Sequence, residues 1–148
     1  MSLELQDDQM CYVCGKNNPQ GFRLDFEHPK KGVLTAAVVF SKEHQGYRNI
    51  VHGGMIAMLL DEIMVNLAWK EGAPVVTGEL NVRLKKPTRV GEKVFFEGRI
   101  DREEPRLLRA SATAKNKAGE VLASATAVCV RIRKPNPPKD GSAFGGKS

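Results

Sequence analysis

The chain lacks the features of a membrane-embedded or secreted protein. No apolar run approaches the roughly 18 residues that a membrane-spanning helix needs. The first ten residues, MSLELQDDQM, are acidic and have no apolar core, so we expect no signal peptide. Only three cysteines are present, and an odd number without a secretory signal is typical of free thiols. We therefore expect a cytoplasmic protein, in a reducing compartment, that does not enter membranes.

A broad positive surface is also missing, although the formal net charge is +6. Five basic residues and one acid lie between Arg131 and Ser148, so most of the excess charge belongs to the end of the chain. A basic tail alone is weak evidence for a nucleic-acid partner, and we expect none. Residues 134–148 are rich in Pro, Gly and Ser and are predicted to be disordered. Residues 1–133 fit a single domain, with 1–20 as an N-terminal extension.

The stretch from Ile50 to Ala73 organises the chain and reads IVHGGMIAMLLDEIMVNLAWKEGA. Its apolar residues recur at the spacing of one helix face. These residues are Ile56, Leu59, Leu60, Ile63, Met64 and Leu67. Gly72 and Pro74 supply stop signals beyond them. We predict one helix of about 18 residues, roughly 27 Å long.

Two features of this predicted helix favour a chemical role. Gly53 and Gly54 at its start leave backbone N–H groups exposed where the helix dipole is positive, a suitable place for a developing oxyanion. Asp61, nine positions after His52, is expensive to bury unless it has a partner or a task. Two plainer interpretations stay open. The His-Gly-Gly motif can be a simple turn, and Asp61 or Glu62 can be the solvated edge of the helix.

Alternating apolar and polar residues predict strands on both sides of the helix. In the strand after the helix, Val76, Leu80, Val82 and Leu84 are expected on one face and Thr77 on the other. Short connections between strands imply antiparallel pairing. We therefore predict an α+β fold in which a curved antiparallel sheet of about five to six strands wraps around the helix. The predicted strands are residues 23–27, 33–40, 75–86, 94–102, 107–115 and 121–133.

A Cys11-x-x-Cys14 turn lies ahead of the first strand. Its spacing resembles a metal knuckle, but a metal site needs two more ligands. The spare candidates, His28, His44 and Cys129, show no recognised spacing. We predict that no metal binds and that the small thiols pack beneath the turn.

The segments HGGMIAMLLDEIM, VTGELNVRLKKP and VGEKVFFEGRI together resemble the hotdog-fold thioesterases of the phenylacetic-acid-degradation (PaaI-like) type. The similarity covers roughly residues 20 to 133, and the CxxCG opening resembles a bacterial subgroup of that family. The resemblance implies a hotdog fold and hydrolysis of an acyl- or aryl-CoA thioester to free acid and coenzyme A. It also implies a homodimer or homotetramer with the site between subunits. Coenzyme A is then part of the substrate, and no separate cofactor is expected.

The resemblance further implies roles for individual residues. An N–H of Gly54 or Gly53 would polarise the thioester carbonyl, and Asp61 would act as nucleophile or as general base on water. Thr77 of the partner subunit would orient that water. His52 would structure the turn or contact the thioester.

Coenzyme A carries a diphosphate and a 3′-phosphate, so basic residues are expected near the mouth of the site. The alternative for each such residue is a charge that solvates the exposed face of the sheet. Family members also carry an Asn or Gln ahead of the His-Gly-Gly motif, for which Gln45 and Asn49 are the candidates. The basic candidates are Lys85, Lys86, Arg89, Arg106 and Arg109.

Two other functional classes remain open from the sequence. A hydratase or dehydratase acting on acyl thioesters would use a histidine base with an acid partner, and His52 precedes the glycines while Asp61 lies inside the helix, so hydrolysis fits better. The second class is a non-catalytic module, either a protein that binds coenzyme A or a metal knuckle that binds nucleic acid through Cys11 and Cys14.

Overall fold

The computed structural model describes residues 5–132. Its main elements are an 18-residue helix, α1 (Gly53–Lys70), and a six-stranded sheet. The strands of the sheet are β1 (Glu27–Lys30), β2 (Val33–Val39), β5 (Val75–Leu84), β6 (Lys93–Glu103), β7 (Leu107–Lys115) and β8 (Val121–Arg131). A short 3-10 helix, η1 (Lys42–His44), and a hairpin of β3 (Gln45–Tyr47) and β4 (Ile50–Val51) lead into α1.

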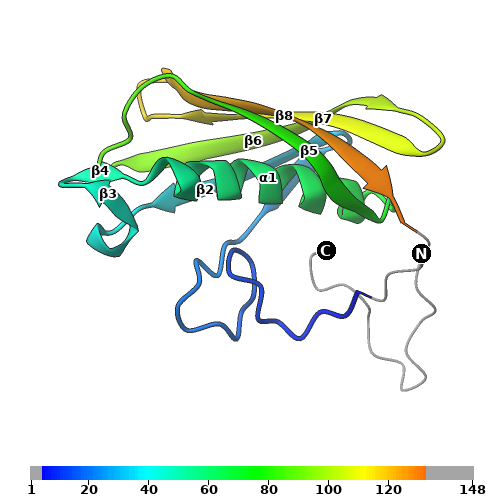
Figure 1. Cartoon of the computed structure of the whole chain (residues 1–148), viewed down its shortest axis with the longest axis horizontal. Helices are drawn as coiled ribbons and strands as arrows, with labels where there is room; N and C mark the ends of the chain where they lie inside the picture. Colours follow the sequence, from blue (N-terminus) through cyan, green and yellow to red (C-terminus); the bar gives the residue numbers. More distant parts are fainter. Residues whose placement is uncertain (1–4, 133–148) are drawn as a thin grey trace.

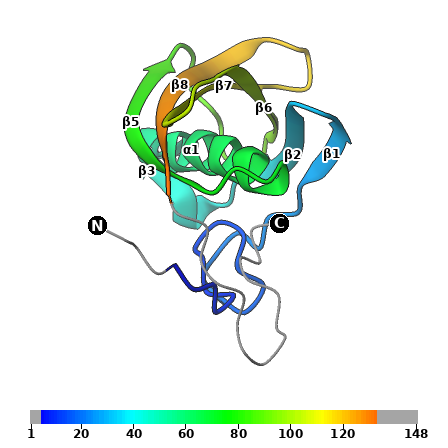
Figure 2. The ribbon, with the colours of Figure 1, turned by 90° about the vertical axis from the view of Figure 1, so that its right-hand side faces the viewer.

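The sheet curves around α1 and covers one side of it (Figures 1 and 2). Its strand order is β1-β2-β6-β7-β8-β5, and every neighbouring pair is antiparallel. Short turns join β6 to β7 and β7 to β8, as the spacing of the predicted strands requires. The predicted α+β architecture is confirmed, including the length of the helix. The tail predicted at 134–148 lies outside the described residues.

The apolar stripe predicted for the helix is fully buried against the sheet. Small side chains on the inner faces of β7 and β8 allow the helix to lie close to these strands. They are Ala110, Ala112, Ala114, Ala123, Ala125 and Ala127. Gly98 in β6 has the same effect, because a Cβ at this position would lie 3.2 Å from the carbonyl oxygen of Ile63 in α1. Within the described part of the chain, no helix has the length and apolarity to cross a bilayer.

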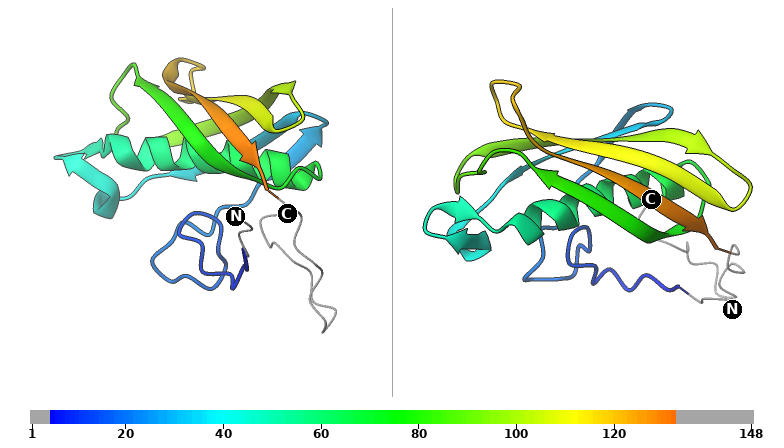
Figure 3. Two further views of the ribbon diagram at one scale, coloured as in Figure 1. Left: turned by 45° about the vertical axis from the view of Figure 1, so that its right-hand side comes forward. Right: turned by 45° about the horizontal axis from the view of Figure 1, so that its top comes forward.

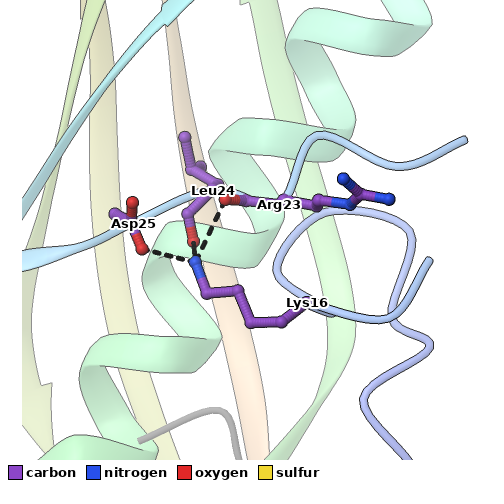
Figure 4. A network of polar contacts seen from close by, with 4 residues as sticks. All are labelled: Lys16, Arg23, Leu24 and Asp25. Carbon is purple, nitrogen blue, oxygen red and sulfur yellow. Dashed lines mark hydrogen bonds and ion pairs between the residues drawn. The ribbon is translucent and has the colours of Figure 1, made fainter. Parts of the chain in front are cut away.

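The N-terminal segment, residues 5–26, passes along the side of α1 that the sheet leaves open (Figures 1 and 3). Val13 and Leu24 of this segment are buried and join the core, and the Leu24 N–H donates to the carbonyl of Val13. The Lys16 ammonium ties the segment together: it donates to the carbonyls of Arg23 and Leu24 and forms an ion pair with Asp25 (Figure 4). The helix is therefore packed between the sheet and an irregular but hydrogen-bonded segment.

Two sequence predictions about strands need correction. Residues 23–27 do not form a strand, because Arg23 has a left-handed φ of 49°, and sheet pairing begins only at Glu27. In β5 the alternation breaks at a bulge, where Thr77 pairs with Cys129 and the next paired residue is Glu79. A bulge adds one unpaired residue and reverses which later side chains face inward. Val76, which precedes the bulge, therefore lies on the opposite face of β5 from Leu80, Val82 and Leu84, and the single face predicted for these four residues is wrong.

Adjacent phenylalanines in β6 offer a test of this packing. Phe96 is buried under the helix, whereas Phe95 is 40% exposed on the other face, with the Lys93 ammonium 5.5 Å from its ring centroid. We expect Phe96→Ala to lower the free energy of unfolding by about 3–5 kcal/mol, because it opens a cavity in the core. The matched control Phe95→Ala should cost less than about 1 kcal/mol. Urea unfolding followed by circular dichroism measures both, and equal losses would contradict the assigned faces.

Candidate active site

One carboxylate of the helix meets the bulged strand at a cavity. The Thr77 hydroxyl donates a hydrogen bond of 2.6 Å to Oδ1 of Asp61, which is half-buried. Both residues line a cavity of about 420 Å³, together with Val65, Trp69 and part of the N-terminal segment. The bulge makes this contact possible, because it turns Thr77 toward α1 while more distant residues of β5 keep their own register with β8.

The contact lies within one copy of the chain. Thr77 was expected to act from the partner subunit, but it reaches Asp61 within a single chain. The physical reason is the tight connection between α1 and β5: Glu71 and Gly72 end the helix, and β5 then runs back beside it. Thr77 and Asp61 therefore form a hydrogen-bonded pair within the same copy of the chain.

Cys129 lies directly across from Thr77 on β8 and is fully buried. Burial and, as the smaller cause, the nearby negative charge of Asp61 together raise the pKa of the Cys129 thiol to about 11. The thiol therefore stays protonated at neutral pH. This favours Asp61 over Cys129 as the group of this trio that can act as a base.

The start of α1 forms a second site at some distance from Asp61. His52 is the N-cap residue, and its Nδ1 accepts the N–H of Gly54 at 2.8 Å. The Gly54 amide is thus already engaged in the helix cap. The Gly53 amide has no hydrogen-bond partner among residues 5–132, and Gly53 lines a cavity of about 490 Å³. Gly53 is the donor that the geometry leaves available.

Gly53 and Asp61 cannot act on the same carbonyl within one copy. They are eight residues apart in α1, which separates them by about 12 Å along the helix axis. A reacting carbonyl needs its oxyanion donor within roughly 3 Å. If both groups serve one reaction, they must come from two copies of the chain.

The expected basic residues divide into two groups. Lys85 and Lys86 line the same cavity as Gly53, and Lys86 forms an ion pair with Glu120. Arg89 lies next to them, because its bridge to Ile50 ties this loop to β4 just ahead of the helix. These three residues gather at the start of α1.

Arg106 and Arg109 are not part of that group within one copy of the chain. Arg106 lies in the turn between β6 and β7, at the opposite end of the molecule from the β3–β4 hairpin (Figure 1). Arg109 is exposed on the outer face of β7 and pairs with Glu104 at 3.4 Å. Alternation along β7 explains the placement of Arg109, because the alanines beside it face the helix.

Polar residues of the β3–β4 hairpin, ahead of the helix, hydrogen-bond to one another. Oε1 of Gln45 accepts the N–H of Asn49 at 3.1 Å, and Asn49 has a left-handed φ of 62°. Gln45 thus shapes the β3–β4 turn. These two residues stand close to His52 in the chain.

A cluster that the sequence did not predict lies beside Asp61. Glu62 is buried, and its Oε1 accepts from the thiols of Cys11 at 3.5 Å and Cys14 at 3.3 Å. The expectation that Glu62 could face water is wrong, because the N-terminal segment covers it. Asn66, one helical turn later, is also buried and donates to the same oxygen at 2.8 Å.

The two thiols of the cluster differ in acidity. The hydrogen bond from Cys14, helped by backbone N–H groups of Cys14 and Val13, lowers the pKa of Cys11 to about 6 against the opposing effects of burial and Glu62. The pKa of Cys14 is raised, first by its hydrogen bond to Cys11 and then by burial and the Glu62 charge. The other ligand candidates named from the sequence lie elsewhere. His28 bonds Glu71 at 2.9 Å, and His44 stacks on Phe22.

A long helix wrapped by a six-stranded antiparallel sheet, with a carboxylate in the helix and a bare amide at its start, defines a hotdog-fold protein of the thioesterase type. The model of the thioesterase superfamily matches residues 48–123, and the chain belongs to this family. Human acyl-coenzyme A thioesterase 13 is 28% identical over 95 residues, which is 62% of this chain and 68% of the relative. A putative esterase of Archaeoglobus fulgidus is 28% identical over 113 residues, 74% of this chain and 71% of the relative.

Solved structures share the fold at lower sequence identity. A Streptococcus mutans protein bound to acetyl CoA has a TM-score of 0.72 at 21% identity, covering 76% of this chain and 91% of its own. The Escherichia coli PaaI protein has a TM-score of 0.71 at 14% identity, covering 75% and 80%. Two variants of a hypothetical thioesterase from Streptococcus pneumoniae each have a TM-score of 0.71, at 15% identity (75% and 92% covered) and 13% identity (90% and 100%). One replaces an aspartate and the other a threonine by alanine, 16 positions apart, which is also the spacing of Asp61 and Thr77.

The role of His52 as a helix cap can be tested by stability. We expect His52→Ala to lower the free energy of unfolding by about 1 kcal/mol, because the Gly54 N–H loses its acceptor. His52→Asn should retain most of the stability, since an Asn side chain accepts from the same amide. Thermal unfolding of the three proteins measures the difference. A loss in His52→Asn as large as in His52→Ala would show that His52 does more than cap the helix.

Proposed function

We propose that the protein is an acyl-CoA thioesterase, which hydrolyses an acyl- or aryl-CoA to the free acid and coenzyme A. The observation that carries the proposal is the hydrogen bond between Thr77 and Asp61 at a cavity beside an apolar helix. Thioester hydrolysis needs a base or nucleophile and a donor for the oxyanion, and Asp61 and Gly53 are suited to these two tasks. The names of the relatives and the acetyl CoA bound to the Streptococcus mutans structure support the substrate class.

In this proposal Thr77 holds the carboxylate of Asp61 in one orientation. A fixed carboxylate can abstract a proton from water or attack the thioester carbon, and a hydroxyl donor limits its rotation. The Streptococcus pneumoniae variants support this pair, because an aspartate and a threonine at the same spacing were chosen for replacement there. His52 serves as the helix cap rather than as the base, since its Nδ1 accepts from Gly54. This use of His52 favours hydrolysis over hydratase chemistry.

A second copy of the chain completes the site. β5 is an edge strand, and Leu80 and Leu84 on it are exposed. Exposed apolar residues on an unpaired edge favour pairing with another strand. A two-fold pairing along β5 would set the start of one helix opposite the middle of the other. Gly53 of one copy would then face Asp61 of the other.

The phosphates of coenzyme A would bind at the same helix start. Lys85 and Lys86 line the cavity of Gly53, and Arg89 lies beside them. Their positive charges suit the diphosphate and the 3′-phosphate. The acyl chain would enter the cavity of the partner's Asp61, which Val65 and Trp69 make partly apolar.

Asp61 and Thr77 give the first test of this function. We expect Asp61→Asn to lower kcat by about 100-fold or more without unfolding, because a positioned base is lost. Thr77→Val should lower kcat by about tenfold or more, since it removes a hydrogen bond to a charged group, and Thr77→Ser should retain most activity. Release of free thiol from a panel of acyl-CoA substrates measures turnover. Unchanged turnover in Asp61→Asn would end this assignment, and loss of conjugation from an enoyl-CoA without free thiol would identify a hydratase.

The shared site gives a second test. Gly53→Pro removes the donor N–H, and proline is accepted at the first helical position, although Leu84 must move aside. Alone, Gly53→Pro and Asp61→Asn should each be nearly inactive. Refolded together, they form mixed dimers in which one of the two sites has an intact Gly53 from one copy and an intact Asp61 from the other. We expect activity to return in the mixture, and no recovery would place both groups in one copy.

A further inference from the structure

Three donors converge on one buried oxygen next to the proposed active site. Oε1 of Glu62 lies 3.3 Å from the Cys14 sulfur, 3.5 Å from the Cys11 sulfur and 2.8 Å from Nδ2 of Asn66. A carboxylate oxygen accepts about two hydrogen bonds, so three donors exceed its ordinary capacity. The ligand atoms of Cys11, Cys14 and Glu62 all lie within 4.8 Å of one another. Two thiols and a carboxylate at this spacing form a donor set of the kind that binds a metal ion.

The distances agree with tetrahedral coordination. With zinc–sulfur bonds of about 2.3 Å and a zinc–oxygen bond of about 2.0 Å, a tetrahedral angle places sulfur and oxygen roughly 3.5 Å apart. The observed separations from Glu62 are 3.3 Å and 3.5 Å. A cation between the three ligands would replace both thiol protons, while Asn66 would keep its hydrogen bond to that oxygen.

The backbone around the two cysteines has the form of a metal knuckle. The Gly15 N–H donates to the Cys11 carbonyl at 2.9 Å and closes a tight turn over the two cysteines. Gly15 is required at this turn, because a Cβ there would lie 2.4 Å from the backbone nitrogen of Cys11. The turn therefore brings both sulfurs to one side, where they reach the same oxygen of Glu62.

Asn66 supplies a second, independent observation. Its side chain is completely buried and holds the Glu62 carboxylate, while its own Oδ1 has no partner among the described residues. Burial of an unpaired amide oxygen is costly. The cost is understandable if Asn66 serves to orient Glu62, as groups behind a metal ligand commonly do.

We propose that Cys11, Cys14 and Glu62 bind a zinc ion. Two thiolates and one carboxylate suit zinc better than magnesium or calcium, which prefer oxygen ligands alone. Cys11 and Glu62 also line the cavity of Asp61, so the fourth position opens toward that cavity and takes a water molecule. Binding releases the thiol protons to solvent.

The ion fastens the N-terminal segment to the helix. Cys11 and Cys14 belong to that segment, Glu62 belongs to α1, and residues 5–8 of the segment form one wall of the cavity. The chain between residues 5 and 26 contains no strand or helix, and it is held by its own turns, by core contacts such as those of Val13 and Leu24, and by the stacking of Phe22 on His44. A metal bridge therefore keeps one wall of the active-site cavity in place.

The direct test is the metal content of the full-length protein. After incubation with zinc in reducing buffer and removal of unbound metal, we expect one zinc per chain by elemental analysis. Cys11→Ser, Cys14→Ser and Glu62→Gln should each lose it, while Cys129→Ala, which removes the third thiol, should keep it. Asn66→Leu should weaken zinc binding by about 10- to 100-fold, as loss of an orienting group does. Cobalt in place of zinc should show thiolate charge-transfer absorption and the strong visible bands of tetrahedral coordination.

A second measurement tests whether the ion holds the N-terminal segment against the helix. Removing zinc with a chelator should speed hydrogen exchange in residues 5–26 by about tenfold or more while the strands of the sheet exchange as before. Neither experiment uses a thioester, so both stand apart from the proposed activity. The proposal is overturned if the reduced protein binds no zinc, if Cys14→Ser keeps the full amount, or if the two cysteines form a disulfide under these conditions.

Discussion

Two neighbouring carboxylates on one apolar helix constrain the rest of this structure. Successive helical residues point about 100° apart, so Asp61 and Glu62 face different surroundings. A carboxylate inside a protein is costly unless it finds donors. Asp61 finds the Thr77 hydroxyl on β5, and Glu62 finds two thiols and the Asn66 amide. The bulge in β5 and the fold of the N-terminal segment both bring these donors into position.

The length of the helix explains why the protein is proposed to act as an oligomer. The Gly53 amide, which has no hydrogen-bond partner among the described residues, is at one end of α1, and Asp61 lies more than two turns further along the helix. A single copy holds these groups too far apart for one thioester. Joining two copies through the exposed edge of β5 would bring each amide to the other copy's carboxylate. Helix geometry thus supports the proposed second subunit, in agreement with the family resemblance.

Sequence patterns predicted the elements well because they depend on local periodicity. The helix ends, its buried stripe and the ranges of β6 and β7 agree with the structure to within a residue or two. The differences fall where a distant contact overrides the pattern. Gly78 adds an unpaired residue in β5 and moves Thr77 toward Asp61 in its own chain. Gly54 uses its N–H in the helix cap, and Glu62 is covered by residues more than 45 positions earlier in the chain.

The sequence by itself determined the class of fold, the central helix and the presence of Asp61 and a glycine start within it, because hydrophobic period and glycine preference are local properties. Only the tertiary structure decided which groups meet. It joined Thr77 to Asp61 in the same chain, left Gly53 as the bare donor, separated Arg106 and Arg109 from the lysines, and gathered Cys11, Cys14 and Glu62. The reason is that each of these contacts joins separate elements, and the residue pattern within one element does not specify how it packs against another.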